Sequence, residues 1–148
     1  MRRPALQYAV WLLSRSGRSE QELRRKLIEK QYDLEEVGQT LAQLREMTLI
    51  DDEKFAVTYA RDKSTIYRRG PRRIFLELLR KGVSKLVASE AIRSVTVSDE
   101  LEAAESLLRA KARQWRELDP LAKKRRALSL LSRRGFSPKV VSQLLKGF

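Results

Sequence analysis

The chain has 148 residues, 42% of them hydrophobic and 34% charged, and its 32 basic and 19 acidic side chains give a formal net charge of +13. This length suffices for one domain or for several small modules with a continuous core, and the apolar content argues against a disordered chain. The absence of cysteine and histidine excludes disulfides, thiolate nucleophiles, metal sites built on thiolate or imidazole, and the commonest general base.

The first third of the chain predicts three amphipathic helices. Apolar residues recur at helical spacing over residues 5–16, and a short turn follows. Ser19 and Glu22 then form a capping box, in which each side chain accepts a hydrogen bond from a backbone amide at the start of the second helix. The third helix is expected over residues 34–47, and Gly38 within it predicts a close approach by another helix.

The middle third predicts a second set of three helices. Asp51 and Asp52 suit the start of a helix, where a short carboxylate caps free amides and meets the positive end of the helix dipole. Gly70-Pro71 ends this helix and begins the next, because proline at the first helical position loses no needed donor. That helix ends at Gly82, and a shorter one follows. The buried stripe of the first of these helices is expected to contain Phe55, Tyr59 and Ile66.

The last third predicts three more helices. A long helix is expected from Ser98, as its N-cap, to about residue 118. Asp119-Pro120 opens the eighth helix and Ser137-Pro138 the ninth, because each pairs a capping side chain with proline at the first helical position. Nine helices and no period-two alternation predict an all-α fold.

A repeat runs through the chain with spacings of 51 and then 53 residues. Its aligned positions are Leu27, Leu78 and Leu131; Gln31, Gly82 and Gly135; Tyr32, Val83 and Phe136; and Val37, Ala88 and Val141. A three-helix unit repeated three times predicts a quasi-linear array, in which each unit buries its apolar face on the next. The expected units are residues 1–48, 49–97 and 98–148. The alternative is a single irregular helical domain in which similar helices recur by chance.

Few residues offer catalytic chemistry. The acidic run Asp51-Asp52-Glu53 has the oxygen ligands that hard cations prefer, but consecutive helical residues point in different directions, and N-capping explains the run. The serines have no histidine to activate them, and no glycine-rich phosphate loop is present. Glu77 is expected to pair within its helix with Arg73, Arg80 or Lys81. The chain is therefore predicted not to be an enzyme and to need no metal or cofactor.

The excess positive charge lies mainly in the later part of the chain. Residues 1–50 have a net charge of +2, residues 51–97 of +5 and residues 98–148 of +6. This uneven distribution favours a surface that binds a polyanion, and contacts with phosphate would be sensitive to salt. Arginine also pairs well with carboxylates, so an acidic protein face is another candidate partner.

Aromatic side chains of single-strand binders stack on bases. Trp11, Tyr59 and Trp115 lie on predicted apolar stripes, and core packing is expected for each. Tyr67, beside two arginines at a helix end, is the aromatic residue predicted to contact nucleic acid.

Three motifs follow one another along the chain. The first is Ser19 to Leu27 (SEQELRRKL), the second is Leu49 to Asp52 (LIDD) with Phe55-Ala56, and the third is Gly70 to Ile74 (GPRRI) with Glu77-Leu78 and Lys81 to Val83 (KGV). In this order they resemble the RecX family, the regulators of the RecA recombinase. The resemblance covers nearly the whole chain and is weakest over residues 98–120. Gln31, where the repeat favours glycine, departs from the pattern and leaves the geometry of that helix end open. The resemblance implies an elongated, curved array of three tandem three-helix repeats.

The resemblance also implies a regulator that binds the RecA filament on single-stranded DNA, bridges its protomers and inhibits ATP hydrolysis and strand exchange. Such a regulator modulates recombinational DNA repair and the SOS response, with double-stranded DNA as a further candidate partner. The residues expected to contact DNA or the filament form a basic face: Arg24, Arg25, Lys26, Arg68, Arg69, Arg72, Arg73, Arg80, Lys81, Lys123, Lys124, Arg125, Arg126, Arg133 and Arg134.

Three other functions are kept as alternatives. A DNA-binding protein that acts independently of RecA would insert basic, helix-turn-helix-like helices into a major groove and leave a footprint. A structural adaptor for an acidic protein would have no affinity for DNA. An enzyme is the last alternative, and metal-dependent nuclease activity would reveal it.

The expected location is the cytoplasm. No apolar run approaches the roughly 20 residues that span a bilayer, and the first residues do not form a signal peptide. The lack of cysteine is compatible with a reducing compartment. We therefore expect a cytoplasmic monomer without a membrane partner.

Overall fold

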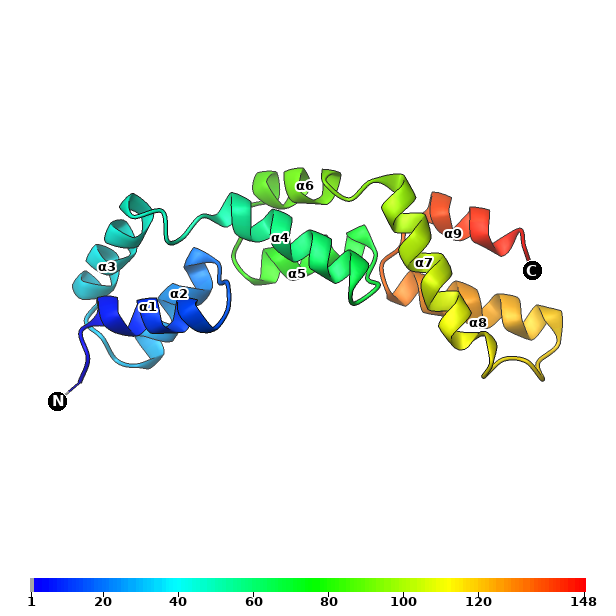
Figure 1. The fold of residues 1–148 in the computed structure, drawn as a ribbon, viewed down its shortest axis with the longest axis horizontal. Helices are drawn as coiled ribbons and strands as arrows, with labels where there is room; N and C mark the ends of the chain where they lie inside the picture. The colour runs from blue at the N-terminus through cyan, green and yellow to red at the C-terminus, as the bar shows by residue number, and fades with distance from the viewer. Residues whose placement is uncertain (1) are drawn as a thin grey trace. The chain divides into compact units, whose positions relative to one another are not determined.

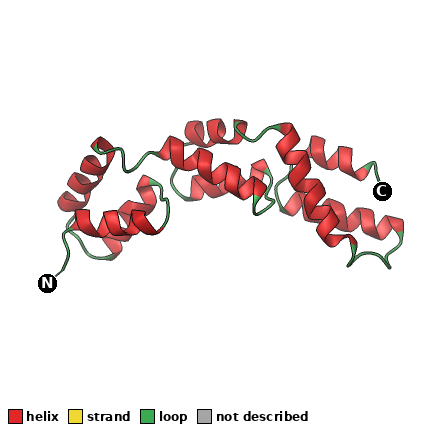
Figure 2. Cartoon of the chain, in the orientation of Figure 1, coloured by secondary structure: helices red, strands yellow, loops and turns green. Residues whose placement is uncertain are grey.

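The computed structural model describes residues 2–148, and within that range it contains nine α-helices joined by loops, with no strand (Figures 1 and 2). The helices are α1 (Ala5–Arg15), α2 (Glu20–Glu29), α3 (Leu34–Glu46), α4 (Asp52–Thr65), α5 (Pro71–Arg80), α6 (Lys85–Arg93), α7 (Val97–Ala112), α8 (Pro120–Arg133) and α9 (Pro138–Leu145). The all-α prediction is confirmed. No helix in the described range is long and apolar enough to cross a membrane.

The described residues form two compact units. The first contains the chain up to Ala56 together with Leu78–Ala88, and the second contains Val57–Glu77 together with Ser89–Phe148. The helices α4, α5 and α6 each contribute residues to both units. The expected domain boundaries after residues 48 and 97 stay predictions.

The core of the first unit lies among α1, α2 and α3, which pack on one another (Figure 1). Leucines at steps of three or four residues along α2 and α3 are fully buried there, as the helical pattern predicted. The core of the second unit contains α7, α8 and α9, with α9 packed against both of the others. Ala104, Leu131 and Val140 are among its buried residues.

The second helix of each repeat ends with the same backbone motif. In the three copies, the amides of Tyr32, Val83 and Phe136 donate to the carbonyls of Leu27, Leu78 and Leu131 at 3.2, 3.1 and 3.1 Å. The residues just before these amides, Gln31, Gly82 and Gly135, have φ angles of 66°, 84° and 84°. This is a Schellman motif, which places one residue in the left-handed region. Gln31 therefore adopts the same turn as the two glycines, although it has a side chain.

Most predicted helix starts are confirmed. The Ser19–Glu22 capping box is present, and Asp119 and Ser137 each accept a hydrogen bond from a backbone amide in the first turn of α8 or α9. The start of α7 was predicted wrongly, because Thr96 rather than Ser98 is its N-cap. A second capping box, formed by Thr96 and Asp99, fixes this start.

Two predictions about packing are wrong. Ile66 follows the last residue of α4 and is 65% exposed, because the buried face of α4 consists of the small residues Ala56, Ala60 and Ser64 at steps of four. Gly38 does not mark a close approach, since a Cβ atom built there would have no neighbour within 4 Å.

We predict that Gln31→Gly stabilises the protein by about 0.5–1 kcal/mol, because a side chain in the left-handed region costs energy that glycine avoids. Chemical denaturation followed by circular dichroism measures the change. Gly135→Ala is the opposite case, since its Cβ atom would lie 2.4 Å from the amide nitrogen of Arg73. It should lower stability by more than about 1 kcal/mol. Equal stability of Gln31→Gly and the natural protein would contradict the account of this helix end.

Candidate nucleic-acid interface

In the second unit, the turn between α4 and α5 lies against the turn after α8. The amide of Gly70 donates to the carbonyl of Arg134 at 2.7 Å. The amide of Arg72 donates to the carbonyl of Gly135 at 3.0 Å. A Cβ atom on Gly70 would lie 2.2 Å from the amide nitrogen of Phe136, so only glycine permits this approach. We call this backbone contact the glycine junction.

The glycine junction brings together five arginines from the two turns and the ends of their helices. They are Arg68, Arg69, Arg73, Arg133 and Arg134, and we call them the arginine cluster. Burial lowers the pKa of Arg134, and the positive charges of the other four arginines lower it further. The Arg134 guanidinium also donates to the carbonyl of Tyr67 at 3.0 Å, which holds it at the turn.

One carboxylate, that of Glu77, pairs with members of the cluster. It accepts hydrogen bonds from Nη1 of Arg69 at 2.9 and 3.0 Å and from Nε of Arg73 at 3.3 Å. The Arg73 pair is the one predicted within the helix. The hydroxyl of Tyr59 also donates to Glu77, at 3.2 Å, and burial together with the Glu77 charge raises the pKa of Tyr59 to about 12. Among residues 2–148, the other three cluster arginines form no ion pair.

In a related contact of the first unit, a positive side chain is paired with a negative one. There the hydroxyl of Ser19 donates to the carbonyl of Lys81 at 2.5 Å. A Cβ atom on the neighbouring Gly82 would lie 2.3 Å from the side chain of Gln21, so this approach is also close. The ammonium of Lys81 pairs with the carboxylate of Glu22 at 2.8 Å.

The repeat spacing makes the two contacts equivalent and shows how they differ. Glu22 corresponds to Arg73, 51 residues later, and Lys81 corresponds to Arg134, 53 residues later. The acid–base pair of the first unit is thus replaced by two arginines in the second. Neighbouring like charges destabilise a fold, so the arginine cluster does not contribute to stability in the way that the Lys81–Glu22 pair does. Such local conflict with folding is typical of functional sites.

The fifteen residues predicted to contact DNA or a filament are distributed over both units. Arg24, Arg25, Lys26, Arg80 and Lys81 belong to the first unit, and Arg68, Arg69, Arg72, Arg73, Lys123, Lys124, Arg125, Arg126, Arg133 and Arg134 belong to the second. In the second unit, the five cluster arginines lie together, while four of the others follow one another at the start of α8. That these residues contact DNA or a filament stays a prediction.

Tyr67 lies beside the arginine cluster and is 50% exposed. The ammonium of Lys63 lies 4.0 Å from the centroid of its ring, and the guanidinium of Arg69 lies 5.5 Å away. An exposed ring flanked by cations has the features of a base-stacking site. Its contact with nucleic acid stays a prediction.

The prediction that Trp11 packs in the core is wrong. Its side chain is 41% exposed, because Ala5, Ala9 and Leu12 form the buried face of α1. The Trp11 ring stacks on that of Tyr8 with centroids 5.9 Å apart, and the guanidinium of Arg15 lies 5.2 Å from it. The spacing of four residues between Trp11 and Arg15 is the sequence signal that could have identified this surface pair. Trp115, by contrast, is buried as predicted.

The acidic run at the start of α4 makes structural contacts. Asp51 accepts a hydrogen bond from the amide of Lys54 at 3.2 Å, as a capping residue does. Asp52 accepts one from the amide of Glu20 at 2.9 Å, and burial raises the pKa of Asp52. No group of three or more acidic residues within residues 2–148 is arranged to hold a metal ion.

The fold and this surface define a tandem helical-repeat protein with a concentrated basic site. Models of the RecX family match the chain three times: the first three-helix domain at residues 5–44, the second at residues 51–92 and the third at residues 98–145. The chain therefore belongs to the RecX family. This confirms both the resemblance and the three tandem three-helix repeats.

Curated relatives bear the name regulatory protein RecX. One from Mycobacterium sp. (strain JLS) is 35% identical over 134 residues, which cover 88% of this chain and 73% of the relative. One from Geobacillus thermodenitrificans (strain NG80-2) is 33% identical over 141 residues, which cover 95% of this chain and 52% of the relative. The chain thus spans about half of this longer relative.

Solved RecX structures have the same fold. The crystal structure of RecX from Lactobacillus salivarius matches with a TM-score of 0.86 at 22% identity, covering 97% of this chain and 93% of that one. A second crystal structure, of a regulatory protein RecX, matches with a TM-score of 0.87 at 27% identity, covering 97% of this chain and 72% of that one.

We predict that Arg134→Gln does not destabilise the protein and raises its unfolding free energy by about 0.5 kcal/mol at low salt, because it removes repulsion within the arginine cluster. Added salt should abolish this gain by screening. Thermal unfolding at two ionic strengths measures it. The matched control is Lys81→Gln at the equivalent position, which breaks an acid–base pair and should cost about 0.5–1 kcal/mol. An equal loss in both variants would mean that Arg134 has a stabilising role.

Proposed function

We propose that this protein binds the RecA filament on single-stranded DNA and inhibits its ATP hydrolysis and strand exchange, and so modulates recombinational DNA repair and the SOS response. Membership of a family of regulatory proteins supports this proposal. The observation that carries it is the arginine cluster, in which only Arg69 and Arg73 pair with a carboxylate, that of Glu77, among the residues that the structure describes. The protein would act in the cytoplasm, as a monomer, and without catalytic chemistry of its own.

The arginine cluster would bind anionic groups of the filament. A guanidinium presents donors in a planar fork that matches either a phosphate or a carboxylate. Binding to the DNA backbone would weaken steeply with salt, because condensed counterions are released. Several weak contacts from one chain to successive filament subunits would increase the overall affinity.

The second candidate is a DNA-binding protein that acts without RecA. Short turns join α4 to α5 and α8 to α9, as in helix-turn-helix proteins, and the glycine junction brings the basic ends of these helices together. This arrangement favours the second candidate. This candidate predicts protection of particular sequences on double-stranded DNA, whereas a filament modulator needs no preferred sequence.

The first experiment is a titration of this protein into RecA hydrolysing ATP on single-stranded DNA. We expect inhibition at amounts well below one molecule per RecA protomer, because one regulator would affect many subunits of a filament. Inhibition only at amounts that coat the DNA would favour simple competition for the strand. No effect at any amount would contradict the proposal.

The same assay tests the arginine cluster. Arg133→Gln with Arg134→Gln should weaken inhibition at least about tenfold, because two charges that lack carboxylate partners are lost. The matched control is Arg113→Gln with Arg116→Gln, which removes two exposed charges near the end of α7. Full inhibition by the cluster variant, or equal losses in both, would remove the cluster from the proposed site.

Trp11 extends the proposed contact with single-stranded DNA to the first unit. Its exposed ring, with arginine beside it, suits stacking on a base. We predict that oligothymidine quenches the tryptophan fluorescence of the natural protein. The quenching should disappear in Trp11→Phe, because the remaining Trp115 is buried. Quenching that persists in Trp11→Phe would show that the signal has another origin.

A further inference from the structure

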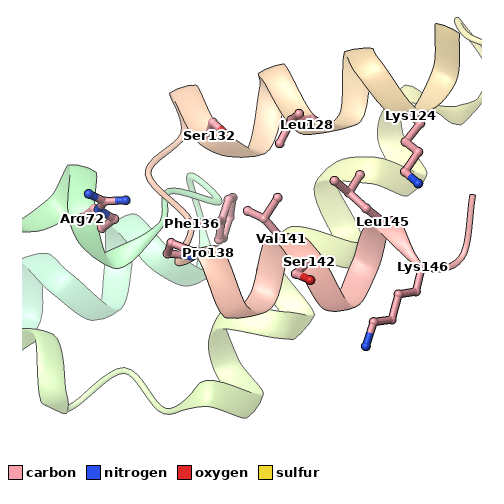
Figure 3. Close-up of a pocket in the computed structure, with 10 residues that line it drawn as sticks. All are labelled: Arg72, Lys124, Leu128, Ser132, Phe136, Pro138, Val141, Ser142, Leu145 and Lys146. Carbon is pink, nitrogen blue, oxygen red and sulfur yellow. The ribbon is translucent and has the colours of Figure 1, made fainter. Parts of the chain in front are cut away.

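A groove of about 500 Å³ runs between α8 and α9 (Figure 3). Its lining residues are Arg72, Lys124, Leu128, Ser132, Phe136, Pro138, Val141, Ser142, Leu145 and Lys146. The floor is apolar, since it contains the buried side chains of Phe136 and Val141. The rim is basic at both ends, with Arg72 at one end and Lys124 and Lys146 at the other (Figure 3).

A second groove, of about 460 Å³, lies between α5 and α6 in the same unit. It is lined by Pro71, Arg72, Phe75, Leu76, Ser89 and Ile92. Four of its residues correspond to residues of the first groove at the repeat spacing of 53: Pro71 to Lys124, Phe75 to Leu128, Ser89 to Ser142, and Ile92 to Leu145. Arg72 lines both grooves. The two grooves are therefore equivalent surfaces of successive repeats.

The lining of the grooves suits an occupant that has both carboxylates and aliphatic side chains. Leu128 is 47% exposed in one groove and Leu76 is 53% exposed in the other, so each offers an apolar contact that the chain itself does not cover. No acidic residue lines either groove, whereas three cations line the first. An occupant with carboxylates around aliphatic side chains would complement both features.

The same features disfavour a nucleic-acid strand in the α8–α9 groove. The only aromatic ring that lines the α8–α9 groove is that of Phe136, which is 2% exposed and cannot stack on a base. Phosphates could meet the rim cations but would leave the apolar floor uncovered. The distance along α8 from Lys124 to Ser132 is about 12 Å, which matches about two turns of a helical peptide.

We propose that the α8–α9 and α5–α6 grooves each bind an acidic peptide segment that inserts aliphatic side chains. This inference rests on the proposed function, because a filament of identical subunits would present the same segment to successive grooves. The arginine cluster would then contact phosphate, while the grooves contact protein.

The test uses a fluorescein-labelled peptide of about 12 residues, with leucines on one helical face and glutamates on the rest. Fluorescence anisotropy with the full chain should report saturable binding. A peptide with lysines in place of the glutamates, and an oligothymidine competitor, should not occupy the same site. If the lysine peptide binds equally well, or if oligothymidine competes, the proposal is overturned.

Variants connect the binding to the α8–α9 groove. Leu128→Glu, and separately Lys124→Glu with Lys146→Glu, should each weaken peptide binding at least about tenfold. All three residues are solvent-exposed to a degree that tolerates substitution, and circular dichroism checks the fold. Arg113→Glu, an exposed charge reversal outside both grooves, is the matched control and should leave affinity unchanged. Unchanged binding in the groove variants would overturn the proposal.

A second readout separates this inference from the proposed function. The natural chain has no cysteine, so Ser142→Cys provides a unique attachment point for a photo-crosslinker in the α8–α9 groove. Crosslinking to RecA in the filament supports the proposal, and crosslinking to DNA overturns it. If the peptide binds but the protein has no effect on RecA, the groove inference stands and the proposed function is rejected. If the natural protein inhibits RecA but does not bind the peptide, the proposed function stands and the groove inference is overturned.

Discussion

The backbone contact at the glycine junction fixes two turns of the second unit against each other. Two hydrogen bonds join the turn at Gly70 to the turn at Gly135. Neither turn has room for a Cβ atom at its glycine, so the contact requires glycine at both positions. Because arginines flank both glycines, the close approach of the two backbones also forces positive charges together. The concentration of charge is thus a consequence of how the repeats pack.

The first unit shows that this packing does not require like charges to lie close together. Its equivalent contact uses a serine hydroxyl and the Lys81–Glu22 ion pair, and it places opposite charges where the second unit has Arg73 and Arg134. The same backbone motif ends the second helix of each repeat, even where Gln31 replaces glycine. The repeats have therefore retained their backbone geometry while their surface charge diverged. The prediction that this divergence costs stability agrees with the proposed binding role of the second copy.

Local signals allowed much of the fold to be predicted from the sequence. Capping side chains and prolines mark helix starts through contacts within three or four residues, so Ser19, Asp119 and Ser137 were assigned correctly. Burial depends on distant partners, and there the helical pattern misplaced Trp11 and Ile66. Alanines form much of the buried face in both helices, together with Leu12 in α1 and Ser64 in α4, and hydrophobicity alone ranks a large side chain above alanine. The arginine cluster could be predicted as basic segments, but not as one group, because its members meet only through the glycine junction.

Arg72 links the geometry of the junction to that of the proposed binding surfaces. Its amide is held by the carbonyl of Gly135, and its side chain lines both grooves. A charge cluster alone selects a partner by sign, whereas an apolar groove adds a requirement for shape and hydrophobicity. Since one backbone contact positions the cluster and the cation shared by the grooves, the two kinds of selection are not independent. A substitution at either glycine would displace both the arginine cluster and Arg72. Keeping both glycines therefore preserves the proposed binding surfaces as well as the packing.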